Sequence, residues 1–169
     1  MGDEELTERV ARLEERVDRL ERRGERPAAA RPGRDDDTFW ALNALKDRVD
    51  DPGAVLFTGT VTLPGGEHYD WQQGHLAEDL LADDWSQAAD ALAALAHPVR
   101  LLLLREILHG THTTAELSAL EELGTTGQVY HHLRQLVAAG WLRTTARGRY
   151  AVPGERVVPL LTVLATARR

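Results

Sequence analysis

The chain has 169 residues, of which 28% are charged and 43% hydrophobic, and it contains no cysteine. Without cysteine it can form neither a disulfide framework nor a thiolate-based metal or catalytic site. No apolar run approaches the roughly 20 residues that a membrane-spanning helix needs, and the first residues are acidic rather than basic. The sequence therefore predicts a cytoplasmic protein without membrane association.

The net charge of -7 is unevenly distributed along the chain. Residues 1–34 are neutral, residues 35–84 carry a net charge of -10, and residues 85–169 carry +3. An evenly acidic protein would repel nucleic acid, but a separate basic segment could still bind it. The charge pattern indicates three segments with different roles.

Residues 1–23 have the apolar spacing of a coiled coil. The recurring positions, at intervals of four and three, are Leu6, Val10, Leu13, Val17 and Leu20. Valine at a positions with leucine at d positions favours parallel two-stranded packing, in which Arg9 would face Glu14 of the partner. The alternative is a single amphipathic helix on its own domain, because so few heptads are marginally stable alone.

The next segment contains a linker and a small acidic extension. Residues 24–37 are rich in Pro, Gly and Ala and predict a flexible linker. Residues 38–84 form the extension, beginning with a short helix that Thr38 can cap and that ends near Asp50.

Residues 54–73 predict a β-hairpin within this extension. Apolar residues alternate with threonines before a Pro-Gly-Gly turn, so one strand face should be buried. The expected buried positions are Val55, Phe57, Gly59, Val61 and Leu63. Because two strands alone are unstable in water, this hairpin must lie against helices or against a partner subunit.

Residues 85–169 predict short helices followed by a second hairpin and a closing helix. A first helix would bury Ala88, Leu92, Leu95 and Ala96, and a second, Pro98–Leu108, would be central to the core. Thr113 or Thr114 would cap a third. A fourth helix, 126–139, would bury Val129, Leu133, Leu136 and Val137. Strands 141–145 and 149–153 would flank a basic tip, and the closing helix, about 155–167, would present Val158, Leu161 and Leu164.

This order of elements predicts a winged helix-turn-helix domain, mainly α with a small β component. No acidic residue lies between Glu122 and Glu155, although about one residue in six of the chain is acidic. That acid-free window holds helix 126–139 and the second hairpin, the wing, which are the elements that such a fold lays on phosphates.

Five motifs, in order, resemble the ArsR-type bacterial winged-helix repressors. They are 94–101 (ALAHPVRL), 114–117 (TAEL), 128–136 (QVYHHLRQL), 139–142 (AGWL) and 147–150 (RGRY). The resemblance covers residues 88–167 and does not extend to the N-terminal half. It implies a homodimeric transcription regulator whose closing helix packs across the dimer axis and whose recognition helices enter major grooves about 34 Å apart.

Carried onto this sequence, the resemblance predicts a sequence-specific regulator, most simply a dimeric repressor of an operator in double-stranded DNA. The candidate DNA contacts are Thr125, Thr126, Gln128, Tyr130, His131, Arg134, Arg143, Arg147 and Arg149. Gln128 is the first candidate for base readout, because its amide can pair with adenine at two points. His132 is expected to be buried and hydrogen-bonded to a backbone carbonyl. The alternative function is a winged-helix protein-interaction module that dimerises through the coiled coil.

The sequence predicts no cofactor, metal or catalysis. Cysteine ligands that metal-sensing relatives carry are absent, and His109 and His112 have no third ligand nearby. Neighbouring pairs such as Asp83 and Asp84 would point in different directions, so we expect no enzyme. Aromatic residues of the extension could line a pocket for an unidentified effector, although they more often form a core. The coiled coil could also join two dimers into a tetramer.

Overall fold

The computed structural model describes residues 38–168, and the side chain of residue 121 is outside that description. The predicted coiled coil and linker therefore lie outside the described residues. The chain divides into two compact units, Met1–Ala44 and Leu45–Arg169. Helix α2, Trp40–Lys46, falls at their boundary within the predicted helix 38–50, and none of its residues is buried.

The first hairpin forms as predicted, with strands β1, Ala54–Thr62, and β2, His68–Leu76. The strands pair antiparallel without a register shift, from Ala54 opposite Leu76 to Thr62 opposite His68. From Phe57 to Thr62, half-buried and exposed side chains alternate in the predicted phase. The expectation for Val55 was wrong, since 54% of this residue is exposed.

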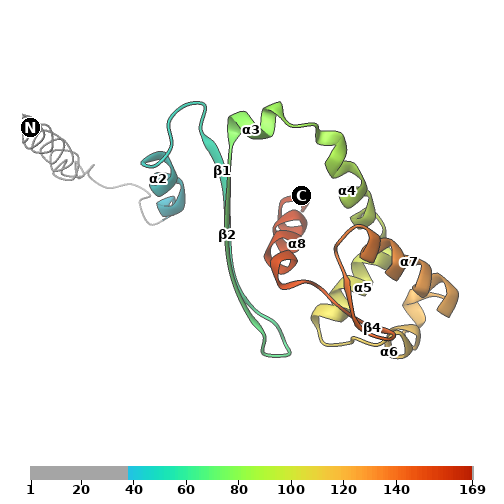
Figure 1. Cartoon of the computed structure of the whole chain (residues 1–169). Helices are drawn as coiled ribbons and strands as arrows, with labels where there is room; N and C mark the ends of the chain where they lie inside the picture. The colour runs from blue at the N-terminus through green and yellow to red at the C-terminus, as the bar shows by residue number, and fades with distance from the viewer. Residues whose placement is uncertain (1–37, 169) are drawn as a thin grey trace, which may run out of the picture. The chain divides into compact units, whose positions relative to one another are not determined.

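The buried face of this hairpin packs on helix α8, Gly154–Thr166. A Cβ placed on Gly59 would lie 2.8 Å from Cγ1 of Val158, and one placed on Gly154 would lie 3.0 Å from Cε1 of Tyr69. These contacts place α8 against the turn half of the hairpin, which explains why Val55, at the other end of β1, stays exposed. In Figure 1 α8 lies between this hairpin and the helices α5 and α7.

Most of the helices in the second unit are short. They are α3 (Ala77–Ala82), the 3₁₀ turn η1 (Trp85–Ala88), α4 (Ala89–Leu95), α5 (Pro98–Leu108), α6 (Thr114–Ser118), the 3₁₀ turn η2 (Glu121–Leu123) and α7 (Thr126–Ala138). Helix α5 is central, as predicted, because its Leu103, Leu104 and Ile107 are nearly inaccessible and pack with buried residues of α6, α7 and α8.

The prediction for the buried face of α4 was correct at Leu95 and wrong at the other three positions. Ala88, Leu92 and Ala96 are exposed, whereas Ala94 and Leu95 are buried. Arg100 explains this orientation, because its guanidinium donates hydrogen bonds to the carbonyl oxygens of Ala93 and Ala94. The last turn of α4 is thereby held toward α5.

The second hairpin is shorter than predicted. Strand β3 is Arg143–Ala146 and strand β4 is Arg149–Ala151. Trp141 and Leu142, expected in the first strand, are buried in the core, and their N–H groups donate to the carbonyl of Leu136. The segment after Ala151 is likewise buried as it turns into α8.

The second unit thus combines helices with two separate two-stranded antiparallel sheets. Within residues 38–168, no helix has the length and apolar character needed to cross a membrane.

Candidate nucleic-acid interface

Helix α7 has one buried face and one exposed face. Val129, Leu133 and Leu136 have no solvent exposure, as the sequence predicted, and Val137 is half-buried. The spacing of these residues at intervals of three and four is what anchors one side of a helix. The exposed positions are the predicted contacts Thr125, Thr126, Gln128, Tyr130, His131 and Arg134.

A capping box fixes the start of α7 and occupies Gln128. The side-chain oxygen Oε1 of Gln128 accepts hydrogen bonds from the N–H and the hydroxyl of Thr125, at 2.9 and 3.1 Å. In return, Oγ1 of Thr125 accepts from the N–H of Gln128. Two-point pairing with adenine needs both ends of the amide, so the oxygen would first have to leave this cap.

Beside the start of α7, a hollow of about 440 Å³ opens toward α6. Tyr130, 43% exposed, forms one side, and Thr114 and Ser118 of α6 contribute to the other. The hydroxyl of Ser118 is buried without a hydrogen-bond partner. The surface between the two helices is therefore concave and partly polar.

The β3–β4 hairpin is anchored to the segment that precedes α6. The N–H and the hydroxyl of Thr114 both donate to the carbonyl of Gly148, and the N–H of Tyr150 donates to the carbonyl of His112. Thr113 and Arg149 form an isolated antiparallel bridge. Segment 112–114 therefore bonds to the hairpin through its backbone, outside the two-stranded sheet, and holds the hairpin tip close to α6.

The arginines near this surface differ in their surroundings. Among the described side chains, no carboxylate forms an ion pair with Arg134, Arg143, Arg147 or Arg149. Arg149 nevertheless acts on Glu116. The pKa of Glu116 is lowered mainly by the hydroxyl and then the N–H of Thr113, and the charge of Arg149 contributes less. The positive charge of Arg149 is therefore partly offset by the negative charge of Glu116 in α6.

Behind the exposed face of α7, His132 lies in a cluster of polar side chains. Its ring centroid is 4.5 Å from that of His97 and 5.7 Å from that of His131. The expected hydrogen bond to a backbone carbonyl is absent at Nδ1, which is buried without a partner. Burial, followed by the nearby charges of His97, Arg100 and His131, lowers the pKa of His132.

Arg100 links this cluster to α4. Besides its bonds to the end of α4, it donates from Nη1 to Oε1 of Gln135 in α7, at 2.5 Å. Arg100 thus joins three helices through one guanidinium. No local sequence pattern announces this role, because its partners lie 7 and 35 residues away.

The predicted dimerisation stripe on α8 is partly covered by the same chain. Val158 is 3% exposed and contacts β1, whereas Leu161 and Leu164 are half-buried against the core. Leu6, Val10, Leu13, Val17 and Leu20 lie outside the described residues.

The capping boxes were missed in the sequence, although both have the Thr-x-x-Glu or Thr-x-x-Gln spacing that identifies them. In residues 38–168, no group of three or more His, Asp or Glu side chains is placed to hold a metal ion.

Comparison of the chain with protein-family models finds no match. Comparison with curated proteins finds no match either.

Proposed function

We propose that this protein is a sequence-specific DNA-binding transcription regulator that acts as a homodimer, most simply as a repressor, through a winged helix-turn-helix of the ArsR type. Helices α6 and α7 are the two helices of that motif, and the β3–β4 hairpin is its wing. Helix α7 reads the major groove, and the hairpin contacts the minor groove or its phosphates.

The observation that carries this proposal is that α7 and the β3–β4 hairpin both expose arginines and contain no acidic residue. Both elements come from the acid-free window, and the arginines on them form no ion pair among the described side chains, although the charge of Arg149 acts on Glu116. A charged surface of one sign in an acidic protein supplies the phosphate attraction that DNA binding requires.

The anchoring of each element supports the same proposal. Three core residues hold the inner side of α7, and the bonds from Thr114 and Tyr150 hold the hairpin. Both elements therefore reach DNA without ordering on binding, which saves the entropy that a flexible reader would lose. The free N–H groups in the first turn of α7 can donate hydrogen bonds to a phosphate beside Thr126.

One observation favours the protein-interaction module as a second candidate. The carboxamide oxygen of Gln128 is engaged in the helix cap, so the position best suited to base readout has lost half of its hydrogen-bonding capacity. Tyr130 beside a concave surface is also a common feature of protein interfaces.

Binding to the duplex upstream of the protein's own gene tests the proposal. The full chain is titrated against that duplex and against a scrambled duplex of equal length, at two salt concentrations, by fluorescence anisotropy. We expect tighter binding to the native duplex, and affinity for both that falls steeply as salt rises. Absence of binding at low salt would contradict DNA binding, and equal affinity for both duplexes would contradict sequence specificity.

A further inference from the structure

Strand β1 has an open edge. The N–H of Leu63 donates to the carbonyl of Glu67, and the N–H of Ala77 donates to the carbonyl of Gly53. Along an antiparallel strand, successive residues direct their N–H and C=O groups alternately toward and away from the neighbouring strand. Since Gly53 and Leu63 bond across the hairpin, the odd-numbered residues of β1 direct these groups toward β2. The even-numbered residues direct theirs away from β2. These outward residues are Ala54, Leu56, Thr58, Thr60 and Thr62.

Within the described part of the chain, no third strand joins this sheet. The N–H and C=O groups of the outward residues therefore form a row along the free edge. Such an edge is a template for another strand, and natural proteins block unwanted pairing with charged residues, prolines or bulges.

Strand β1 has none of these blocking features. Its nine residues, AVLFTGTVT, include no charge and no proline, and its register with β2 shows no bulge. β-Branched and aromatic residues make up most of the sequence, which favours extended pairing.

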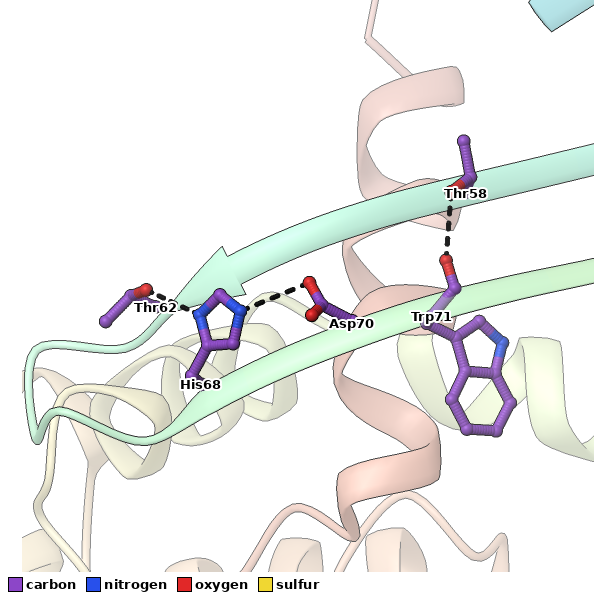
Figure 2. Close-up of polar contacts among 5 residues, drawn as sticks. All are labelled: Thr58, Thr62, His68, Asp70 and Trp71. Carbon is purple, nitrogen blue, oxygen red and sulfur yellow. Dashed lines mark hydrogen bonds and ion pairs between the residues drawn. The ribbon is translucent and has the colours of Figure 1, made fainter.

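Strand β2, in contrast, has residues that discourage pairing along its outer edge. It carries Asp70, two histidines and Gly74. Figure 2 shows His68 between Thr62 and Asp70, with Nδ1 2.9 Å from the hydroxyl of Thr62 and Nε2 3.1 Å from Oδ1 of Asp70. A hydrogen bond from the Thr60 side chain is the main factor that lowers the pKa of Asp70, which keeps a negative charge on this strand.

The open edge is also held in place. Gly59 and Tyr69 rest on α8, so one face of the hairpin is fixed to the core. Figure 2 shows the indole of Trp71 and the side chain of Thr58 on opposite faces, while the hydroxyl of Thr58 donates to the carbonyl of Trp71 at 3.1 Å. A pre-formed edge loses little conformational entropy when another strand pairs with it.

We propose that β1 pairs edge to edge with β1 of a second copy of this chain, antiparallel about a two-fold axis at Thr58, to make one continuous four-stranded sheet. Thr58 is both the midpoint of β1 and an outward residue. The axis therefore sets Ala54 opposite Thr62 of the partner subunit, and Leu56 opposite Thr60 of the partner subunit. Each outward residue then donates one hydrogen bond and accepts one, and no charged side chain faces another across the seam.

A second copy is the occupant that the sequence supports. The heptad spacing of residues 6–20 predicts parallel pairing of two chains, and the composition of residues 24–37 predicts a linker between that pair and the extension. A chain of that predicted type and length would span on the order of 20 Å, which would raise the local concentration of the second β1 strand to the millimolar range.

The pairing also suits the geometry of a two-fold reader. A two-fold axis perpendicular to the shared sheet leaves both α8 helices on the same face of that sheet. In Figure 1 α7 lies on the side of α8 away from the hairpin, so both copies of α7 would face in one direction. The pairing deepens the homodimer of the proposed function, but its evidence and its test do not involve DNA.

Cysteine crosslinking tests this pairing, because the natural chain contains no cysteine. Two full-length variants, Thr58→Cys and Gln72→Cys, are matched, since the two residues lie opposite each other in the hairpin. Across the proposed seam the two copies of position 58 have Cα atoms about 5.5 Å apart. The two copies of position 72 are separated by three strand spacings, about 14 Å.

A short bismaleimide, with a reach between these two distances, is added to each variant without DNA, and covalent dimer is measured on a denaturing gel. We expect most of the Thr58→Cys chain and little of the Gln72→Cys chain to be crosslinked. The reverse result would assign the seam to β2. Crosslinking of neither variant would show that a segment of the same chain, or nothing, covers β1. Either of these results overturns the proposal.

Amide hydrogen exchange of the natural chain gives a second test that needs no substitution. The N–H groups of Leu56, Thr58 and Thr60 should exchange slowly in concentrated protein and at least tenfold faster after dilution below the dimer dissociation constant. The outward N–H groups of Asp70 and Gln72 should exchange fast at both concentrations. Concentration-independent exchange of the β1 amides would contradict the proposal.

Discussion

Gly59 in β1 and Val158 in α8 approach so closely that a Cβ on Gly59 would lie 2.8 Å from Cγ1 of Val158. Only a glycine allows the hairpin to reach this distance from the helix. The absence of a side chain in the middle of a strand normally weakens it, and here the contact with α8 offsets that loss.

Replacement of Gly59 by alanine should therefore destabilise the second unit. The β-branched side chain of Val158 is stiff and cannot rotate freely away from the new methyl group. We therefore expect the free energy of unfolding to fall by about 1–3 kcal/mol, as for an overpacked core. Urea unfolding followed by circular dichroism measures this change. The matched control is Gly127→Ala in α7, where a Cβ meets nothing within 4 Å.

We expect Gly127→Ala to leave stability unchanged or to raise it by about 0.5–1 kcal/mol, because alanine favours helix. The double variant Gly59→Ala with Val158→Ala should recover part of the loss. If Gly59→Ala unfolds at the same urea concentration as the natural chain, the packing of the hairpin on α8 described here is wrong.

Arg147 at the tip of the second hairpin should contribute to DNA affinity without contributing to sequence preference. Arg147→Ala should weaken binding to native and scrambled duplexes alike and lower the slope of log affinity against log salt by about one. Arg168→Ala, at the exposed end of the chain, removes the same charge outside the proposed interface and should change neither quantity. Equal effects of the two substitutions would indicate that only net charge matters.

Substitutions of Gln128 and Thr125 can distinguish a role in the helix cap from a role in base readout. Either Gln128→Ala or Thr125→Ala breaks the capping box and should lower the free energy of unfolding by about 0.5–2 kcal/mol. Gln128→Ala alone should also relax base preference at one position in each half-site, by about 1 kcal/mol. Binding to a set of singly substituted duplexes measures that preference. Unchanged preference in Gln128→Ala would restrict this residue to the helix cap.

His132 should make the fold sensitive to acid. Because burial lowers its folded-state pKa below the ordinary 6.5, the unfolded chain takes up a proton at a higher pH than the folded chain does. Stability is therefore complete above about pH 6.5 and falls as the pH drops from there toward the folded-state pKa. The groups that face His132 are His97, Arg100, His131 and Gln135.

Urea unfolding between pH 5 and 8 tests this expectation. His132→Gln should flatten the loss of stability on the acid side of about pH 6.5. His109→Gln, at the exposed end of α5, replaces a histidine outside the cluster and serves as the control. An identical pH profile for the natural chain and His132→Gln would contradict the assignment.

Much of the local structure could be predicted because it depends on neighbouring residues. The interval of three and four between Val129, Leu133 and Leu136 was sufficient to orient α7, and the Pro-Gly-Gly turn was sufficient to place the first hairpin. Helical spacing and turn residues are local signals that involve only a few neighbouring residues. The bounds of α5, α7 and α8 were correspondingly close, whereas α2 ends four residues before the predicted end near Asp50.

Contacts between distant segments could not be predicted in the same way. Leu92 carries the helical spacing of a core residue but is exposed, because Arg100 and the indole N–H of Trp141 bind backbone carbonyls of α4 from the other side. Nothing in the local pattern shows which of two weakly apolar faces a short helix will bury. Likewise, the sequence required the first hairpin to have a support but did not identify α8 as that support.

The bonds from segment 112–114 to the second hairpin also bear on the order of folding. The Thr114 hydroxyl and the Gly148 carbonyl are 34 residues apart, and α6 and α7 lie between them. Closing so long a loop is slow unless the intervening helices have already made it compact, so this contact should form late. Thr114→Val should therefore accelerate unfolding while leaving the refolding rate nearly unchanged. The part of the surface proposed to touch DNA phosphates would then be the last to assemble in each folding event and the first to be lost when the chain begins to open.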